Sequence, residues 1–231
     1  ADGYENDLVD RTGLIAHGRG EAFDYLLGER THPEAELSAK VAAAHLLLAK
    51  NPVISVNGNT AVLVPDELVE LAKVASAKIE VNIFHRTEDR LNKLVSFLEA
   101  HGAGSVLGLN PDAKLPDLSS QRALCTREGI FSADVILVPL EDGDRAEVLA
   151  KMEKTVIVVD LNPLSRSARY GTVTIVDNIC RTIRVIIDQV KDLKQTQKEQ
   201  DLNRYIEDFN NEQNLKQMIL HLKEGEYQNY K

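Results

Sequence analysis

Hydrophobic positions follow two patterns that alternate along the chain from Pro33 onward. Short β-branched runs bounded by turn residues are typical of buried strands, whereas longer segments with apolar residues three or four apart are typical of helices. The runs predict strands at Val53–Val56, Lys78–Phe84, near Val106, and at Asp134–Val138, Thr155–Val159 and Val173–Val176. Helices are predicted at Pro33–Leu48, around Leu68–Val74, and from Thr87, Gly143 and Asn178 onward. Strand runs so apolar suit an α/β fold, with an open parallel sheet covered by helices on both faces.

Two stretches depart from this alternation. Gly13–Ala16 is short and apolar, and Gly18–Gly20 breaks it before an amphipathic segment at Glu21–Leu27. This order predicts a strand or extended turn followed by a helix. Asn110–Phe131 is the least regular part of the sequence and is predicted to be irregular.

The C-terminal end carries a small helical appendage. The helix that begins after Asn178 repeats apolar residues at helical spacing, and Lys194–Gln200 is then almost wholly polar. Two short amphipathic segments follow between Leu202 and Leu222. We therefore predict a domain of residues 1–194 and an appendage of residues 195–231, which packs either on its own sheet or on another subunit.

Composition narrows the class of protein. With 231 residues and 43% hydrophobic content, the chain can bury one large α/β domain. It contains no apolar run of about 18 residues and no charged-then-apolar leader, so we expect a cytoplasmic protein that does not bind a membrane. The formal net charge of -9 argues against a nucleic-acid binder. Cys125 and Cys180 are far apart without a CxxC spacing, which indicates reduced packing thiols.

The loop after the strand Thr155–Val159 has the richest chemistry. In an open parallel sheet, ligands bind beyond the carboxyl ends of the strands. This loop concentrates a carboxylate, an amide, hydroxyls and two arginines, in the order Asp160, Leu161, Asn162, Pro163, Leu164, Ser165, Arg166, Ser167, Ala168 and Arg169. Asx-turn chemistry could use Asp160 and Asn162, but a surface loop needs no such concentration of polar groups. The pattern favours ligand binding.

Three further arginines lie where they could meet an anion. Arg19 stands between Gly18 and Gly20, where the backbone could approach a phosphate, although a turn with a solvated arginine is an equal interpretation. Arg86 and Arg90 follow a strand and are four residues apart, so they can share one face at the start of a helix. Arg90 could instead pair with a neighbouring carboxylate in solvent.

Amide and carboxylate groups follow two other strands. Asn57, Gly58 and Asn59 close the strand Val53–Val56, where one asparagine is explained by helix capping and two suggest a ligand. Asp142 and Asp144 follow the strand Asp134–Val138 and could hold magnesium, which prefers oxygen ligands. A plain acidic turn with either aspartate as an N-cap is the rival interpretation.

Several common signatures are missing from the sequence. There is no G-x-x-x-x-G-K-[ST] phosphate loop and no strand that leads into G-x-G-x-x-G, so a P-loop enzyme and a nicotinamide-dependent dehydrogenase lose their usual support. The sequence also lacks a G-x-S-x-G elbow and an H-E-x-x-H zinc pair. Hydrolase and metalloprotease functions are therefore not favoured.

Five motifs together resemble one family. They are GLIAHGRGEAFDYL, VISVNGNTAVLVP, NIFHRTEDR, VPLEDGDR and DLNPLSRSAR, supported by VDNI at Val176–Ile179. In this order they look like archaeal phosphopantothenate synthetase, and they span nearly the whole chain. The resemblance implies a Rossmann-like fold, a homodimer and an ATP-dependent ligase of coenzyme A biosynthesis that joins 4-phosphopantoate to β-alanine.

The resemblance also assigns roles to residues. It implies that ATP is bound by Arg19, Asp160, Leu161, Asn162, Arg166, Ser167, Asn178 and Ile179. Phosphopantoate is expected at Asn57, Gly58, Asn59, Arg86 and Arg90, and Mg2+ at Asp142 or Asp144. Family members carry a basic, tyrosine-rich segment ahead of the position of Gly13 that has no counterpart here, so we expect that part of the nucleotide site to be missing or built differently.

The expected mechanism passes through an acyl adenylate. The substrate carboxylate attacks the α-phosphorus of ATP, pyrophosphate leaves, and the amine of β-alanine displaces AMP. Arg19 and Arg166 are the candidates for stabilising phosphate charge, and Asn57 with Arg86 for the phosphopantoate end. The alternative is a regulatory module that binds a nucleotide without turnover.

Overall fold

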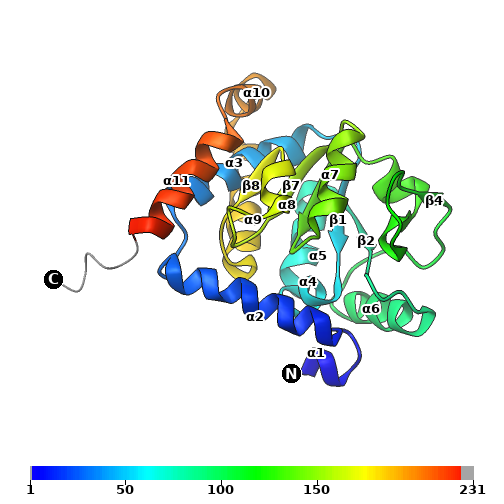
Figure 1. Cartoon of the computed structure of the whole chain (residues 1–231). Helices are drawn as coiled ribbons and strands as arrows, with labels where there is room; N and C mark the ends of the chain where they lie inside the picture. Colours follow the sequence, from blue (N-terminus) through cyan, green and yellow to red (C-terminus); the bar gives the residue numbers. More distant parts are fainter. Residues whose placement is uncertain (1, 225–231) are drawn as a thin grey trace.

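The computed structural model describes residues 2–224 and contains a 6-stranded parallel sheet (Figure 1). The strand order is β3-β2-β1-β6-β7-β8. The bounds are β1 (Pro52–Val56), β2 (Lys78–Val81), β3 (Val106–Leu107), β6 (Val135–Pro139), β7 (Thr155–Val159) and β8 (Val173–Ile175). The order runs outward from β1 in one direction and then reverses at β6, which is the Rossmann arrangement and confirms the predicted fold class. It also places a topological switch point between β1 and β6.

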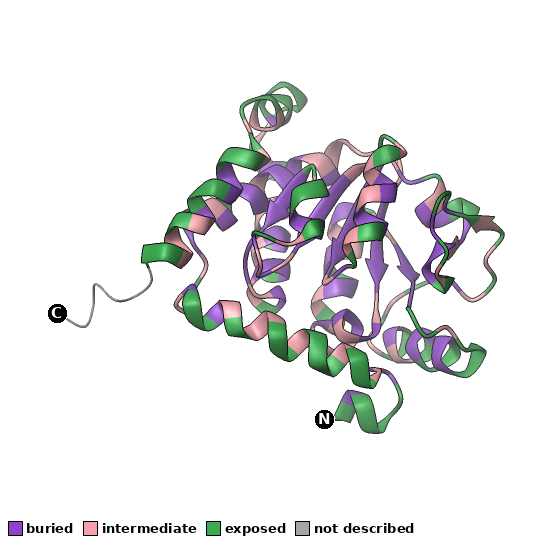
Figure 2. Ribbon diagram, in the orientation of Figure 1, coloured by how far each residue is buried: buried purple, intermediate pink, exposed green. Residues whose placement is uncertain are grey.

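Helices cover the first face of the sheet. Because side chains along a strand alternate between faces, Ile54 and Val56 point to this side, into the largest hydrophobic core. The helices that pack there are α3 (Pro33–Leu48), α5 (Pro65–Ala75), α6 (Glu88–Ala100) and α9 (Ile179–Thr196). All four were predicted, and the side chains of Thr87 and Asn178 cap α6 and α9 as expected. Figure 2 shows the strands of the sheet largely in purple, the colour of buried residues.

The second face is covered by α7 (Gly143–Lys151) and by the irregular segment that precedes β6. That segment contains the antiparallel pair β4 (Ala113–Lys114) and β5 (Leu124–Cys125), a 3-10 turn at Gln121–Ala123 and a π-type turn at Arg127–Phe131. The buried carboxylate of Glu80 on β2 fastens it, because it accepts hydrogen bonds from the backbone N–H groups of Thr126 and Ile130, both at 2.7 Å. Helices and this segment together complete a three-layer fold.

The strand or extended turn predicted at Gly13–Ala16 and the break at Gly18–Gly20 were wrong, whereas the helix predicted at Glu21–Leu27 is confirmed as the end of a longer one. Instead of a strand or turn, a glycine break and a short helix, α2 (Arg11–Leu26) forms one continuous helix. Asp10 caps it by accepting the N–H of Thr12 at 2.9 Å. None of the glycines inside α2 has a positive φ, so each is compatible with helical backbone and none creates a turn.

One strand ends earlier than predicted, and three short helices were not predicted. The strand predicted at Lys78–Phe84 stops at Val81, because the side chain of Asn82 turns to the carbonyl oxygens of Arg122 and Leu124. Two of these short helices follow capping residues: α4 (Gly58–Leu63) after Asn57 and α8 (Arg166–Tyr170) after Ser165. The third, α1 (Asp2–Glu5), lies near the start of the chain.

The C-terminal segments form α10 (Glu199–Glu207) and α11 (Asn211–Glu224), and both contact α3. Met218 of α11 is fully buried against Leu27 and Leu161. The appendage therefore packs on its own sheet, while a further contact with another subunit and the domain boundary at 194/195 stay predictions; residues 225–231 lie outside the described part. Among the helices of residues 2–224, none is long and apolar enough to span a membrane.

Candidate functional site

Two adjoining cavities lie at the carboxyl ends of the strands, on the two sides of the β1–β6 switch point. The larger has a volume of about 530 Å³ and the smaller about 360 Å³. Ala16, Asn59, Leu140 and Asp142 line both, so the cavities share a wall. Helix α2 runs across the carboxyl ends of the strands (Figure 1) and contributes to each cavity. This is the place where an open α/β sheet binds ligands.

The loop after β7 forms one side of the larger cavity, as its sequence suggested. Asp160, Leu161, Asn162, Ser165, Arg166 and Ser167 all line it. The carboxylate of Asp160 accepts hydrogen bonds from the Ser165 hydroxyl at 2.5 Å and from the Asn162 N–H at 2.9 Å. Burial raises the pKa of Asp160, while these hydrogen bonds and the charge of Arg19 oppose the shift. The loop is therefore held in one shape by its own polar groups.

Two arginines bring positive charge to the larger cavity from opposite sides. Arg19 comes from α2, is exposed, and has no hydrogen bond or ion pair within residues 2–224. Arg166 comes from the start of α8 and forms an ion pair with Glu147. Its aliphatic stem lies directly on Gly143. Each guanidinium group can donate a bidentate pair of hydrogen bonds to phosphate oxygens.

Not every residue assigned to the nucleotide lines the larger cavity. Ile179 does, but the amide of Asn178 donates to Glu21 at 3.1 Å and to Asp24 at 3.0 Å, which ties α9 to α2. The hydroxyl of Ser167 is buried and donates to the carbonyl oxygen of Glu141 at 2.6 Å. Asn178 and Ser167 thus connect the elements that form the cavity.

The Asn57–Asn59 turn forms the floor of the smaller cavity, at the end of β1. Asn57 accepts the N–H of Thr60 at 3.0 Å and donates to the carbonyl oxygen of Pro139 at 3.0 Å, so it caps α4 and bridges β1 to β6. Asn59 donates to the carbonyl oxygen of Gly13 at 2.9 Å and holds α2 in place. Capping, the plainer interpretation, therefore accounts for part of this turn.

The structure separates the two arginines predicted for phosphopantoate. Arg90 lines the smaller cavity, but its guanidinium is buried and donates to the carbonyl oxygens of Asp7, His85 and Leu8 at 3.2, 2.8 and 3.2 Å. Arg86 faces a different cavity and donates to the carbonyl oxygen of Gly108. Burial lowers the pKa of Arg86. Arg86 is not brought together with Asn57 in this conformation.

Sequence reasoning missed Arg122, which lines the smaller cavity. It comes from the irregular segment, and its buried guanidinium donates to Asp142 and Glu141, both at 2.8 Å, and to the amide oxygen of Asn82 at 3.2 Å. Glu141 is also paired with Arg145 and is itself buried. No spacing signal marks Arg122 in the sequence, because its partners lie just after β2 and just after β6.

The two aspartates predicted to hold magnesium differ in position. Asp142 lines both cavities with a side chain that is 53% exposed, and one of its oxygens is taken by Arg122. Asp144 lies in the first turn of α7, where its carboxylate accepts the N–H of Arg145 at 2.8 Å, and it lines neither cavity. Asp142 is therefore the better placed of the two.

Strand order and site together define the class: a Rossmann-type α/β protein with paired cavities at the switch point, the larger of which is flanked by arginines. The phosphopantothenate/pantothenate synthetase family matches residues 34–225. The chain belongs to this family.

Curated relatives of the chain carry one name. A 4-phosphopantoate–β-alanine ligase of Thermococcus onnurineus is 48% identical over 224 residues, which cover 96% of the chain and 85% of the relative. One of Methanosarcina mazei is 49% identical and covers 97% of the chain and 88% of the relative. One of Methanospirillum hungatei is 49% identical over 176 residues, 76% of the chain and 72% of the relative. The resemblance found in the motifs is thereby confirmed.

Proposed function

We propose that the chain is an ATP-dependent ligase that joins 4-phosphopantoate and β-alanine into 4'-phosphopantothenate in coenzyme A biosynthesis. The observation that carries the proposal is the pair of cavities with a shared wall at the switch point, in a chain about 48% identical to ligases of that name. Two ligands bound side by side there would meet at Asp142 and Asn59. We also infer a cytoplasmic location, which cell fractionation would test.

The larger cavity suits ATP. Its volume lies within the range of small-molecule sites, and Arg19 and Arg166 supply the charge that a triphosphate requires. Asp160 to Asn162 and Ile179 would bound the nucleoside, and Ser167 and Asn178 would hold the elements that surround it. The N–H groups at the start of α7 can also face an anion.

Asp142 fits magnesium because Mg2+ binds through one or two carboxylates together with substrate phosphates and keeps several waters. Its half-exposed carboxylate lies where the two cavities meet, and Asp144, two residues further along in the first turn of α7, is the second candidate. The ion would neutralise charge that develops on the phosphates.

The smaller cavity suits phosphopantoate. Arg90, Arg122 and the Asn57–Asn59 turn surround it, so its walls offer guanidinium and amide donors to a phosphate, a hydroxyl and a carboxylate. Arg86 stays a candidate from the sequence, but it would have to leave the carbonyl of Gly108 and its own cavity to reach the ligand.

The geometry supports an adenylate route. A carboxylate held near Asp142 would face the α-phosphorus of ATP in the larger cavity, so the two ligands need alignment rather than a protein nucleophile. Attack on phosphorus breaks the α–β phosphoanhydride and releases pyrophosphate. The amine of β-alanine then attacks the acyl carbon, loses a proton and expels AMP. Arg19 and Arg166 would stabilise negative charge throughout.

Product analysis tests the reaction. Full-length protein supplied with ATP, Mg2+, phosphopantoate and β-alanine is expected to yield phosphopantothenate, AMP and pyrophosphate. ADP and phosphate would refute the adenylate route. Binding of ATP without any phosphopantothenate would favour the regulatory module.

Kinetics of three variants test whether ATP binds in the larger cavity and phosphopantoate in the smaller one. Arg166→Ala is expected to raise KM for ATP about 10- to 100-fold, because the variant loses one charge-assisted hydrogen bond to the phosphates. Arg122→Ala and Arg86→Ala are compared for KM of phosphopantoate, and the cavity walls predict the larger rise for Arg122. Arg204→Ala is the matched control, because that arginine is 81% exposed on α10. Equal losses toward both substrates in all three variants would contradict the division.

We infer that the chain forms a homodimer, with α2 as the contact. Large apolar side chains stand in solvent on this helix, with Ile15 66% and Tyr25 71% exposed. Such exposure on one helix marks interaction surfaces. Light scattering after size exclusion should report a dimer for the wild type and a monomer for Ile15→Glu/Tyr25→Glu. Leu220→Glu, an exposed leucine on α11, should leave the dimer intact; a monomeric wild type would refute the assembly.

A further inference from the structure

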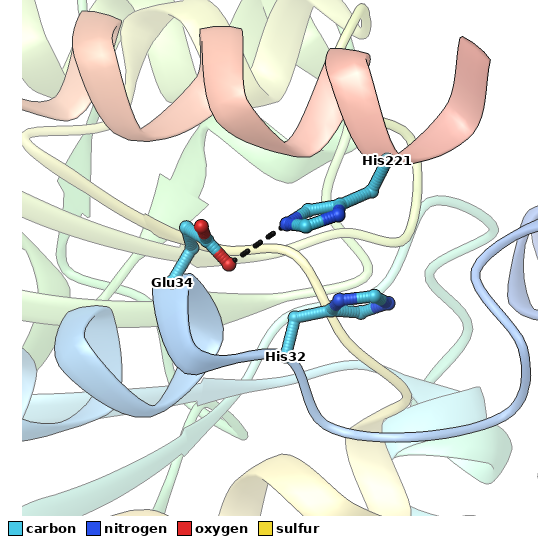
Figure 3. A group of neighbouring side chains, drawn as sticks. All are labelled: His32, Glu34 and His221. Carbon is cyan, nitrogen blue, oxygen red and sulfur yellow. Dashed lines mark hydrogen bonds and ion pairs between the residues drawn. The ribbon is translucent and has the colours of Figure 1, made fainter. Parts of the chain in front are cut away.

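Two histidines and a glutamate converge away from both cavities. His32 and Glu34 stand at the start of α3, and His221 lies in the last turn of α11 (Figure 3). One possible ligand atom from each of the three residues lies within 4.8 Å of the others. None of them lines the cavities at the switch point. Two imidazoles and one carboxylate form a typical zinc ligand set.

A neighbouring carbonyl group determines which ring nitrogen of His32 carries the hydrogen. The ring is buried, and its Nε2 is 2.8 Å from the carbonyl oxygen of Leu27. Because a carbonyl can only accept, Nε2 must carry the hydrogen, and Nδ1 is left with a free lone pair. Figure 3 shows one ring nitrogen of His32 turned toward Glu34 and His221 and the other turned away. Metal-binding histidines are oriented by this kind of bond from the second nitrogen.

The remaining two ligands are already in contact. Nε2 of His221 is 3.0 Å from Oε2 of Glu34, and the rings of His221 and His32 stack with centroids 4.3 Å apart. Ligand bonds of about 2.0–2.1 Å in a tetrahedral site require ligand atoms about 3.3 Å apart. The carboxylate and His221 are close to this separation, and since every pair of ligand atoms lies within 4.8 Å, the pairs that include His32 would contract by at most about 1.5 Å on binding. Glu34 and His221 are 23% and 32% exposed, which leaves a path for an ion.

The cluster stands where α11 is attached to the domain. Two turns before His221, the amide of Asn214 donates to the hydroxyl of Ser38 on α3 at 2.9 Å. Between these contacts Met218 of α11 packs with Leu27, which directly follows α2. A metal ion at the cluster would therefore fasten α11 to α3 and, through Leu27, support the end of the helix that covers the larger cavity.

We propose that His32, Glu34 and His221 form a site for Zn2+, with water in the fourth position, that clamps α11 onto α3. The three side chains supply two neutral nitrogens and one negative oxygen, a donor set that favours zinc over magnesium. None of its three ligands lines the cavities assigned to the ligase substrates.

Zinc binding by the full-length chain tests the proposal. Protein treated with a chelator and dialysed into excess Mg2+, which fills oxygen sites, is titrated with Zn2+ and separately with Co2+ as a spectroscopic probe. We expect about one zinc per chain, a tetrahedral cobalt spectrum and a rise in Tm on zinc addition. Glu34→Gln and His221→Ala should weaken zinc binding at least roughly 10- to 100-fold and abolish the rise.

His101→Ala is the matched control. His101 pairs with Asp66 at 2.6 Å, but no third ligand joins that pair within residues 2–224. This variant should bind zinc as the wild type does. Circular dichroism of the metal-free variants shows that each is folded, and His221 and Glu34 were chosen because they are less buried than His32. Failure of the wild type to bind zinc, or equal binding by all variants, would overturn the proposal, whatever the outcome of the ligase assay.

Discussion

The variant Gly143→Ala would place a methyl group where the side chain of Arg166 now lies. A Cβ built on Gly143 would stand 2.7 Å from Cγ and 2.9 Å from Cδ of Arg166, and closer still to its Cβ. Carbon atoms prefer separations of about 3.5–4.0 Å, so Arg166 would have to move by roughly 1 Å. Gly143 has no positive φ, and its backbone therefore accepts alanine without strain.

The expected cost falls on ATP use as well as on folding. The nearest atom of Arg166 is its Cβ, which moves only with the backbone at the start of α8, so we expect a loss of about 1–3 kcal/mol of stability, the typical range for overpacking. A misplacement of about 1 Å in a positioning group can cost up to about 100-fold in rate. Steady-state kinetics with varied ATP should therefore show a fall in kcat/KM that approaches that of Arg166→Ala.

Gly104→Ala is the control for this prediction, because a Cβ there meets no atom within 4 Å. It should keep both its kinetics and its thermal midpoint. Wild-type kcat/KM for ATP in Gly143→Ala would refute the reasoning, and so would a loss of activity explained wholly by unfolded protein. The first result would mean that Arg166 does not act on ATP from its present position.

Three further outcomes are expected. Gly20→Ala should raise the free energy of unfolding by about 1 kcal/mol in urea denaturation, because Gly20 is in a helix and its Cβ would meet no neighbour; a loss would restore the glycine-turn interpretation. Ser167→Ala should lower that free energy by about 1–3 kcal/mol, since the buried carbonyl of Glu141 loses its 2.6 Å donor, and calorimetry would measure the loss. Burial raises the pKa of Asp160, so the protonated carboxyl favours folding below the unfolded-state pKa and this contribution is lost as pH rises through the folded pKa. In urea titrations at a series of pH values, Asp160→Asn should become more stable relative to wild type as the pH rises from the unfolded-state pKa to the folded-state pKa of Asp160. A difference in free energy of unfolding that does not change with pH would contradict the raised pKa of Asp160.

Predictions from the sequence were accurate where the residues of a single strand or helix determine its local structure. Strands β1, β6 and β7 were predicted within about a residue, because a β-branched run between turn residues has few other options. The capping roles of Thr87 and Asn178 were also predicted from local pattern. Since parallel strands present their carboxyl ends at one edge, the loops after them had to meet, and the Asp160 loop does line the larger cavity.

The prediction failed where a local signal competed with a distant contact. Gly18 and Gly20 suggested a turn, but the cap at Asp10 and the bond from Asn59 to Gly13 place that segment in a helix across the sheet edge. Arg122, which the sequence did not suggest, lines the smaller cavity, whereas Arg86 faces a different one, because each guanidinium follows the partners that the fold offers it.

By itself, the sequence determined the α/β class, the family and the loops that carry the chemistry, since periodicity, caps and motifs are properties of neighbouring residues. Only the tertiary structure decided which side chains share a cavity. Arg122 meets Asp142 across 20 residues, and His221 meets Glu34 across 187. The physical reason is that the direction of a long side chain is set by the acceptors and packing around it, and these come from elements that the chain brings together only when it folds.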